Sequence, residues 1–206
     1  MLGTVSEKSA NKALLPDCFS AALQNSRKAR RYTQGKNMSL LKAAKMMLGY
    51  MAWANKITIT SVARLPDSEL YKDRNSHFGN IVSTLNHIYV VEDVFKAHLT
   101  GEKHGYTHRN TDKCPTINEL SSNQEKMDRW YMDYISNLDE KALEEIISFE
   151  YIGGGKGDLS IYEIILHLVN HAANHRGHVS EMMYKTDFKL QTHDLTVYLR
   201  DVHKYV

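Results

Sequence analysis

Cysteine, proline and long apolar runs are all scarce in this sequence. Its 206 residues include two cysteines and three prolines. Cys18 and Cys114 lie in polar surroundings without CxxC or Cys/His spacing, so the sequence signals neither a disulfide framework nor a thiolate metal site. No stretch approaches the roughly 18 consecutive apolar residues that a membrane helix requires. These absences predict a protein of a reducing compartment, the cytoplasm, that does not span a membrane.

No charge of one sign dominates the chain, but the charges are unevenly distributed. The formal net charge is +2, and 24% of the residues are charged against 42% apolar, a composition typical of one globular domain. Residues 1–37 carry seven Lys/Arg and two acidic residues, a net +5 that leaves −3 for the remainder. We therefore predict a disordered basic extension over residues 1–37 and a globular domain over residues 38–206. The basic cluster of the extension is too small and too poor in aromatics to predict a nucleic-acid partner; it comprises Arg27, Lys28, Arg30 and Arg31.

Apolar residues recur at three-to-four spacing over four long segments, which predicts four helices. The predicted helices span residues 39–63, 77–100, 116–138 and 160–184. Their ends carry recognisable signals, namely Ser39 as an N-cap, Gly101 as a stop, and capping-box spacing at Thr116/Glu119 and Ser160/Glu163. The connections are long enough to cross over, so the expected fold is an all-α four-helix bundle.

The segments between the predicted helices differ in character. Residues 101–115 are polar and aperiodic, which predicts a surface loop. Residues 146–152 are rich in β-branched and aromatic side chains and precede a glycine-rich run, which predicts a short hairpin or loop before the fourth helix. That run does not match the P-loop pattern, so phosphate binding is not expected. A short C-terminal helix near residues 194–200 completes the predicted fold.

Histidine, unlike cysteine, is frequent in this sequence. The last long helix contains His167, His171, His175 and His178, which project within about 80° of one another at 100° per residue. Two histidines four residues apart can bind one ion, and the pairs His167/His171 and His171/His175 both remain open. His87 interrupts the apolar face of the second helix and is the leading third ligand. A lone histidine in a helix more often makes one hydrogen bond, so a structural role stays open as well.

Three segments of the chain resemble the DinB/YfiT-like superfamily of metal-binding four-helix bundles. They read YMAWANK at residues 50–56, DRNSHFGNI at 73–81 with TLNH at 84–87, and HLVNHAANHRG at 167–177. The resemblance implies a homodimer and a divalent metal ion, nickel or zinc, held by His87, His171 and His175. The chain departs from the usual pattern at Asn174, where the family has His, and at His178, where it has Gln.

The resemblance also bears on residues around the implied ligands. It implies that Asn55, His167 and Asn174 could contact the imidazole ligands on the side away from the metal ion and orient them. Trp53 is expected in the core. Arg176 could bind an anionic substrate, but a salt bridge between helices is the favoured interpretation.

Three neutral imidazoles would leave a bound ion with an open position, as in catalytic sites. The segment between His171 and His175 has alanine where HExxH metalloproteases have their glutamate, so peptide hydrolysis is not expected. The resemblance implies a metal-dependent enzyme resembling thiol S-transferases, acting on a small molecule with a low-molecular-weight thiol. The alternative is a non-catalytic, metal-binding, dimeric stress-response protein, and a third hypothesis has no metal at all. Imidazole suits zinc, nickel, copper and iron alike, so the ligands do not select the metal.

Removing residues 1–37 tests the predicted domain boundary. We expect the truncated protein to keep the melting temperature and the metal content of the full chain, because the predicted core and ligands begin after Asn37. Thermal denaturation and elemental analysis measure both quantities. A loss of either one would contradict the boundary.

Overall fold

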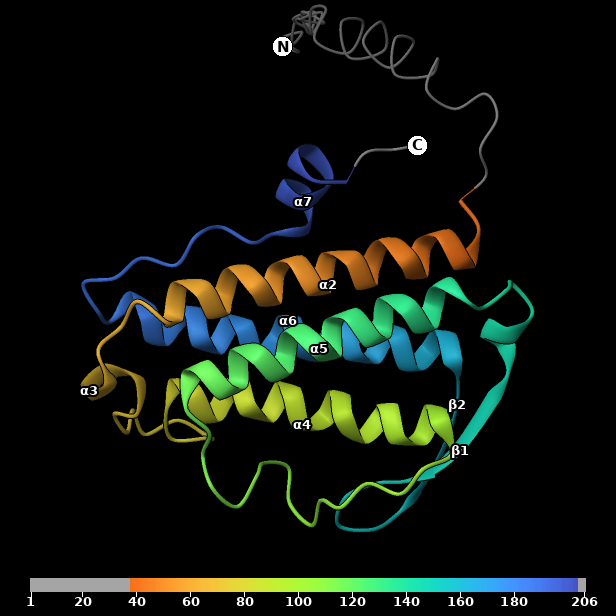
Figure 1. The fold of residues 1–206 in the computed structure, drawn as a ribbon, viewed down its shortest axis with the longest axis horizontal. Helices are drawn as coiled ribbons and strands as arrows, with labels where there is room; N and C mark the ends of the chain where they lie inside the picture. Colours follow the sequence, from red (N-terminus) through yellow and green to blue (C-terminus); the bar gives the residue numbers. More distant parts are fainter. Residues whose placement is uncertain (1–37, 204–206) are drawn as a thin grey trace, which may run out of the picture. The chain divides into compact units, whose positions relative to one another are not determined.

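Four long helices make up most of the computed structural model, which describes residues 38–203 (Figure 1). They are α2 (Leu40–Val62), α4 (Ile81–Thr100), α5 (Ile117–Ser136) and α6 (Ile161–Tyr184). Shorter helical segments are α3 (Asp67–Leu70), the 3₁₀ turn η2 (Ala142–Glu144) and α7 (Leu195–Asp201). The predicted four-helix bundle and short C-terminal helix are confirmed. The extension predicted over residues 1–37 lies outside the described residues.

The predicted capping residues begin three of the long helices. The Ser39 hydroxyl accepts from the Lys42 amide, and Thr116 and Ser160 each form a complete capping box with the glutamate three residues later. The start predicted for the second helix, His77, is wrong. The side chain of Asn80 accepts from the Ser83 amide and starts α4 at Ile81. Residues 74–79 instead form a tight turn, in which the Arg74 amide donates to the Gly79 carbonyl.

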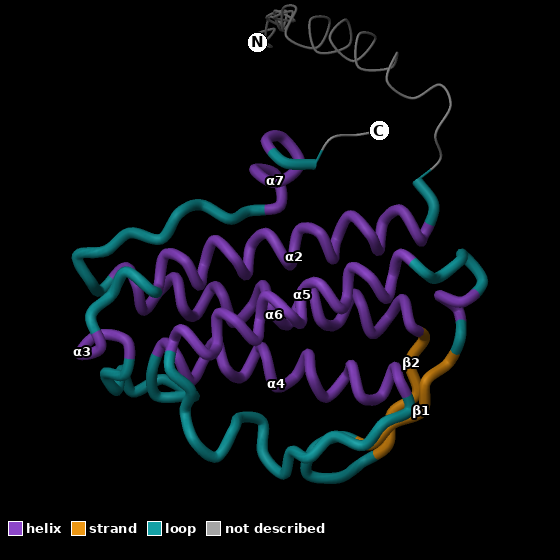
Figure 2. The backbone as a smooth tube through the Cα atoms, viewed as in Figure 1, coloured by secondary structure: helices purple, strands orange, loops and turns teal. Residues whose placement is uncertain are grey.

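The order of the helices in the bundle follows from their contacts. Each of α2 and α4 packs against both α5 and α6, so α2 and α4 lie diagonally opposite. Figures 1 and 2 show that α4 and α5 run in the same direction, as do α2 and α6. The connection between the parallel helices α4 and α5 must therefore return along the length of the bundle, and residues 101–116 follow that path (Figure 2). This loop passes beside α4.

A two-stranded hairpin leads into α6, as the sequence predicts. Strands β1 (Ile146–Glu150) and β2 (Lys156–Ser160) pair antiparallel, with Phe149 opposite Gly157. A Cβ atom at Gly157 would lie 2.7 Å from the Phe149 ring, so the absence of a side chain there lets this ring pack across the hairpin. The turn residues 153–155 are glycines with positive φ, a conformation that other residues rarely adopt. β1 packs against α4.

A polar cluster lies buried among α2, α4, α5 and α6. The Arg176 side chain, 0% exposed, donates to the Asn55 Oδ1 atom at 2.7 Å, and the Asn55 amide donates to Asp128 at 3.0 Å. Gln124 donates to both Asp128 and the fully buried Glu92. The salt bridge favoured for Arg176 is therefore not formed as a direct contact, because Asn55 stands between the guanidinium and the Asp128 carboxylate.

None of the described helices is long and apolar enough to cross a membrane.

Replacing Glu92 tests how the buried cluster couples folding to pH. Burial, and secondarily the Asp128 charge, raises the pKa of Glu92 from 4.5 to about 8. Between these values the folded chain keeps a proton that the unfolded chain releases, so stability falls as pH rises from 4.5 to about 8. Glu92→Gln should flatten this dependence in urea denaturation, and Asp128, with a pKa near 6, should supply the remaining slope. The exposed Glu102→Gln variant should keep the wild-type dependence.

An unchanged slope in Glu92→Gln would show that this carboxyl does not retain its proton in the folded state. Measurements at several pH values between 5 and 8, each with the linear extrapolation to zero urea, give the required comparison.

Candidate metal centre

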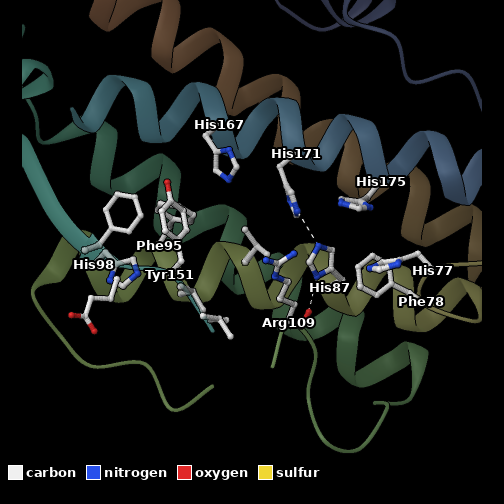
Figure 3. Close-up of a pocket in the computed structure, with 15 residues that line it drawn as sticks. His77, Phe78, His87, Phe95, His98, Arg109, Tyr151, His167, His171 and His175 are labelled. Carbon is white, nitrogen blue, oxygen red and sulfur yellow. Dashed lines mark hydrogen bonds between the residues drawn. The ribbon is translucent and has the colours of Figure 1, made fainter. Parts of the chain in front are cut away.

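Three histidines from two packed helices meet beside the contact between α4 and α6. His87 projects from α4 and is 4% exposed, whereas His171 and His175 project from successive turns of α6 and are half-buried. One ring nitrogen of each lies within 4.8 Å of those of the other two. The Nε2 atoms of His87 and His171 are 3.0 Å apart, and Figure 3 shows the α6 rings directed toward His87. The structure thus brings together the three residues that the resemblance selects.

The orientation of His87 is set from the loop between α4 and α5. Its Nδ1 atom lies 2.6 Å from the carbonyl oxygen of Arg109. A carbonyl can only accept, so Nδ1 carries the proton, and Nε2 of the neutral ring keeps a free lone pair. Phe78, from the turn before α4, stacks on the other side of the ring with centroids 4.1 Å apart and planes 22° from parallel. The His87 Nε2 lone pair therefore faces His171.

All three imidazoles are neutral at physiological pH. Burial, and then the neighbouring His175 and His87 rings, lowers the pKa of His171 to about 3. Burial and the His87 ring lower the pKa of His175 to about 4. Burial also lowers the pKa of His87, against the opposing effect of the Arg109 carbonyl. Neutral imidazole is the form that binds metal ions.

The donor set fits a divalent ion. Two nitrogens bound tetrahedrally with bonds of about 2.0–2.1 Å are separated by roughly 3.4 Å, close to the 3.0 Å between the Nε2 atoms of His87 and His171. Within residues 38–203, the buried Nδ1 atoms of His171 and His175 have no hydrogen-bond partner. Unpaired buried polar atoms cost about 1–3 kcal/mol each. An ion bound through Nε2 would not pair the Nδ1 atom of His171, so the spacing of the Nε2 atoms is the observation that supports a metal ion.

The three histidines lie at one end of an open pocket between α4, α6 and the hairpin. Its volume is about 350 Å³, within the range of small-molecule sites. Most of its walls are apolar, and they include Phe78, Val91, Val94, Phe95, Phe149 and Ile152. A ligand entering this pocket can reach the imidazoles directly.

The other predicted site residues lie in different places. His167 lines the pocket one turn before His171 and packs on Phe95 with ring centroids 5.1 Å apart. That packing explains why burial lowers its pKa although part of the residue is exposed. Asn55 belongs to the buried polar cluster with Arg176, and Asn174 is exposed on α6. Neither asparagine lines the pocket.

Several residues that line the pocket were not predicted from the sequence. Arg109 lies in an aperiodic polar loop, and its contact with His87 is made by the backbone, which no sequence pattern reveals. His77 and Phe78 fall within a segment that carries the family resemblance, and that segment is the signal that could have identified them. Phe149 and Tyr151 show only the alternation typical of a short strand.

Fold and site together define a four-helix bundle with a three-histidine group open to a pocket. The sequence model of the DinB family matches residues 37–186, and the chain belongs to that family.

Two relatives illustrate the similarity. Protein DinB of Bacillus subtilis (strain 168) is 22% identical over 155 residues, which cover 73% of this chain and 90% of that protein. The crystal structure of a DinB-like protein from Bacillus cereus aligns with a TM-score of 0.56 at 18% identity, over 71% of this chain and 94% of that one. At such identity the structural likeness shows the shared fold alone.

Alanine substitution along the histidine stripe tests which rings bind metal. His87→Ala, His171→Ala and His175→Ala should each weaken zinc or nickel binding by more than the roughly 10–100-fold typical of losing an outer contact. His178→Ala is the matched control on the same helix. His178 is exposed and outside the pocket and meets His175 only edge-on, with ring centroids 5.3 Å apart, so its loss should leave the metal bound. Calorimetric metal titration of each variant, with circular dichroism to confirm folding, makes the comparison.

If His178→Ala loses metal as His171→Ala does, or if His171→Ala binds as the wild type, the assignment of the three ligands is wrong.

Proposed function

We propose that this DinB-family protein is a metal-dependent enzyme that transfers a thiol sulfur to a small electrophile. His87, His171 and His175 would hold the divalent ion. The observation that carries the proposal is the position of three neutral imidazoles at the end of an open, mostly apolar pocket. A closed structural zinc site has four protein ligands, whereas three leave room for a substrate.

A bound divalent ion would lower the pKa of a thiol at its open position and so favour the thiolate. The residues of the pocket provide the surroundings of such a thiolate. Val91 and Val94 on α4 help to exclude water, which strengthens electrostatic interactions in the pocket. Arg109 lines the pocket near His87 and His171, and its charge contributes to lowering the pKa of both rings. The same positive charge would stabilise an anionic sulfur.

Two observations favour catalysis over the alternatives. A metal-binding protein without a reaction has no need of a pocket of about 350 Å³ beside its ligands. The Nε2 atoms of His87 and His171, 3.0 Å apart, have about the spacing of two ligands on one ion, which favours metal binding over a purely structural role. The enzyme is therefore the better-supported proposal.

The remaining parts of the proposal come from the sequence. Nickel or zinc is the proposed ion, a homodimer the proposed assembly and the cytoplasm the proposed location. The donor set is compatible with the first of these, because imidazole binds both metals, and it does not select between them.

Conjugation of a thiol to chlorodinitrobenzene tests the reaction. The thiol gives its proton to solvent, its sulfur lone pair bonds to the carbon that carries chlorine, and chloride leaves with the electrons of the C–Cl bond. Bacillithiol, mycothiol and glutathione are each assayed with zinc-loaded and nickel-loaded protein by absorbance of the product. With at least one of them we expect turnover above the uncatalysed rate, and His171→Ala should abolish it.

His108→Ala, which removes an exposed histidine outside the pocket, is the control and should keep full activity. Metal-loaded protein that gives no turnover with any of the three thiols would rule out this reaction.

A further inference from the structure

Aromatic side chains form a continuous wall that leads away from the three histidines. Phe95 of α4 meets Phe149 of β1 with ring centroids 5.2 Å apart, and Phe149 meets Tyr151 at 5.1 Å. All three rings line the pocket that contains the histidines. Figure 3 labels Phe95 and Tyr151 among them. The wall thus joins one of the bundle helices to the hairpin.

Two further histidines extend this wall. His98 stacks on Phe149 with centroids 5.1 Å apart and planes 27° from parallel, and His167 packs on Phe95. Both residues line the pocket, so their rings offer flat faces and edges to a ligand. Arg109 is the one lysine or arginine among the described lining residues, so the far part of the pocket lacks the permanent cations that a polyanionic ligand would need.

Full charges occur at two places among the lining residues that the structure describes. Arg109 lines the pocket beside His87, whose Nδ1 atom contacts the Arg109 backbone carbonyl (Figure 3). Glu150 belongs to β1 and would repel an anionic group at the hairpin. The pocket is thus polarised, with its positive charge near the three histidines and an aromatic wall ending at an acidic residue.

We infer that this pocket binds molecules with an aromatic body and a small anionic or electron-rich group at one end. The aromatic body would lie against Phe95, Phe149 and Tyr151, and the polar group would face His171 and Arg109. Aromatic pairs gain about 0.5–1.5 kcal/mol beyond the burial of their area, which gives the wall selectivity for rings. The inference rests on the proposed function only in naming such a molecule as the electrophilic substrate; binding itself requires no metal.

Tyr151 sets the outer limit of this binding site. It is 50% exposed, yet its side chain lines the pocket at the hairpin. Ile152 follows it and also lines the pocket, and the next three residues are glycines, which have no side chains. Because Tyr151 is half exposed, its removal should alter ligand binding without unfolding the bundle.

Naphthoate and acetate are suitable probes because they share a carboxylate and differ in the aromatic body. Isothermal titration calorimetry on the full chain, metal-free and zinc-loaded, should detect naphthoate binding at least about ten-fold tighter than acetate binding. Loss of one aromatic contact should weaken naphthoate binding about 2- to 10-fold in Tyr151→Ala and in Phe149→Leu. Tyr184→Ala, which removes an exposed ring outside the pocket, is the matched control and should bind as the wild type.

Equal affinities for the two probes would overturn the inference, as would naphthoate binding that is unchanged in Tyr151→Ala and in a folded Phe149→Leu protein. Its failure is separable from failure of the proposed function. A protein that binds naphthoate through these rings but takes up no metal supports the aromatic site and refutes the metal-dependent reaction. A protein that binds metal and conjugates thiols but does not prefer naphthoate gives the opposite result.

Discussion

The packing of α4 against α6 is the contact on which the candidate site depends. It places His87 opposite His171 and His175 and removes much of the water around all three rings. Burying a neutral imidazole costs far less than burying its charged form, so the same contact lowers the pKa of each ring. The bundle thus produces, through desolvation, the protonation state that a metal ion requires.

Adjacent residues of α6 face two very different surroundings. His175 faces the mostly apolar pocket, whereas Arg176 points into the buried polar cluster. Successive residues of a helix point about 100° apart, which is enough to separate these environments. The hydrogen bonds from Arg176 through Asn55 to Asp128 join α6 to α2 and α5. These hydrogen bonds fix how α6 is rotated about its own axis. That rotation directs the α6 histidines toward α4.

The irregular segments complete what the helices begin. The loop between α4 and α5 must return along the bundle because these helices are parallel, and it supplies the Arg109 carbonyl that sets the His87 tautomer. The hairpin before α6 supplies Phe149 and Tyr151 to the pocket. The helices therefore supply the candidate ligands, while these two connections shape the space in which a ligand would lie.

Local features of the sequence determined most of the fold. Capping residues such as Thr116 and Ser160, apolar periodicity and the i, i+4 histidines act within one or two helical turns, so they can be read without knowing the tertiary structure. The start of α4 was misplaced because periodicity extends past a boundary that the Asn80 side chain sets.

Only the tertiary structure decided the surroundings of the histidines. The Arg109 carbonyl, the stacked Phe78 ring and the aromatic wall come from segments that meet only when the chain has folded. The lowered pKa values likewise arise from burial, which depends on every element packed around the rings. The sequence determined by itself which helices form and which side chains could bind an ion; folding decided how those side chains are oriented and what space lies beside them.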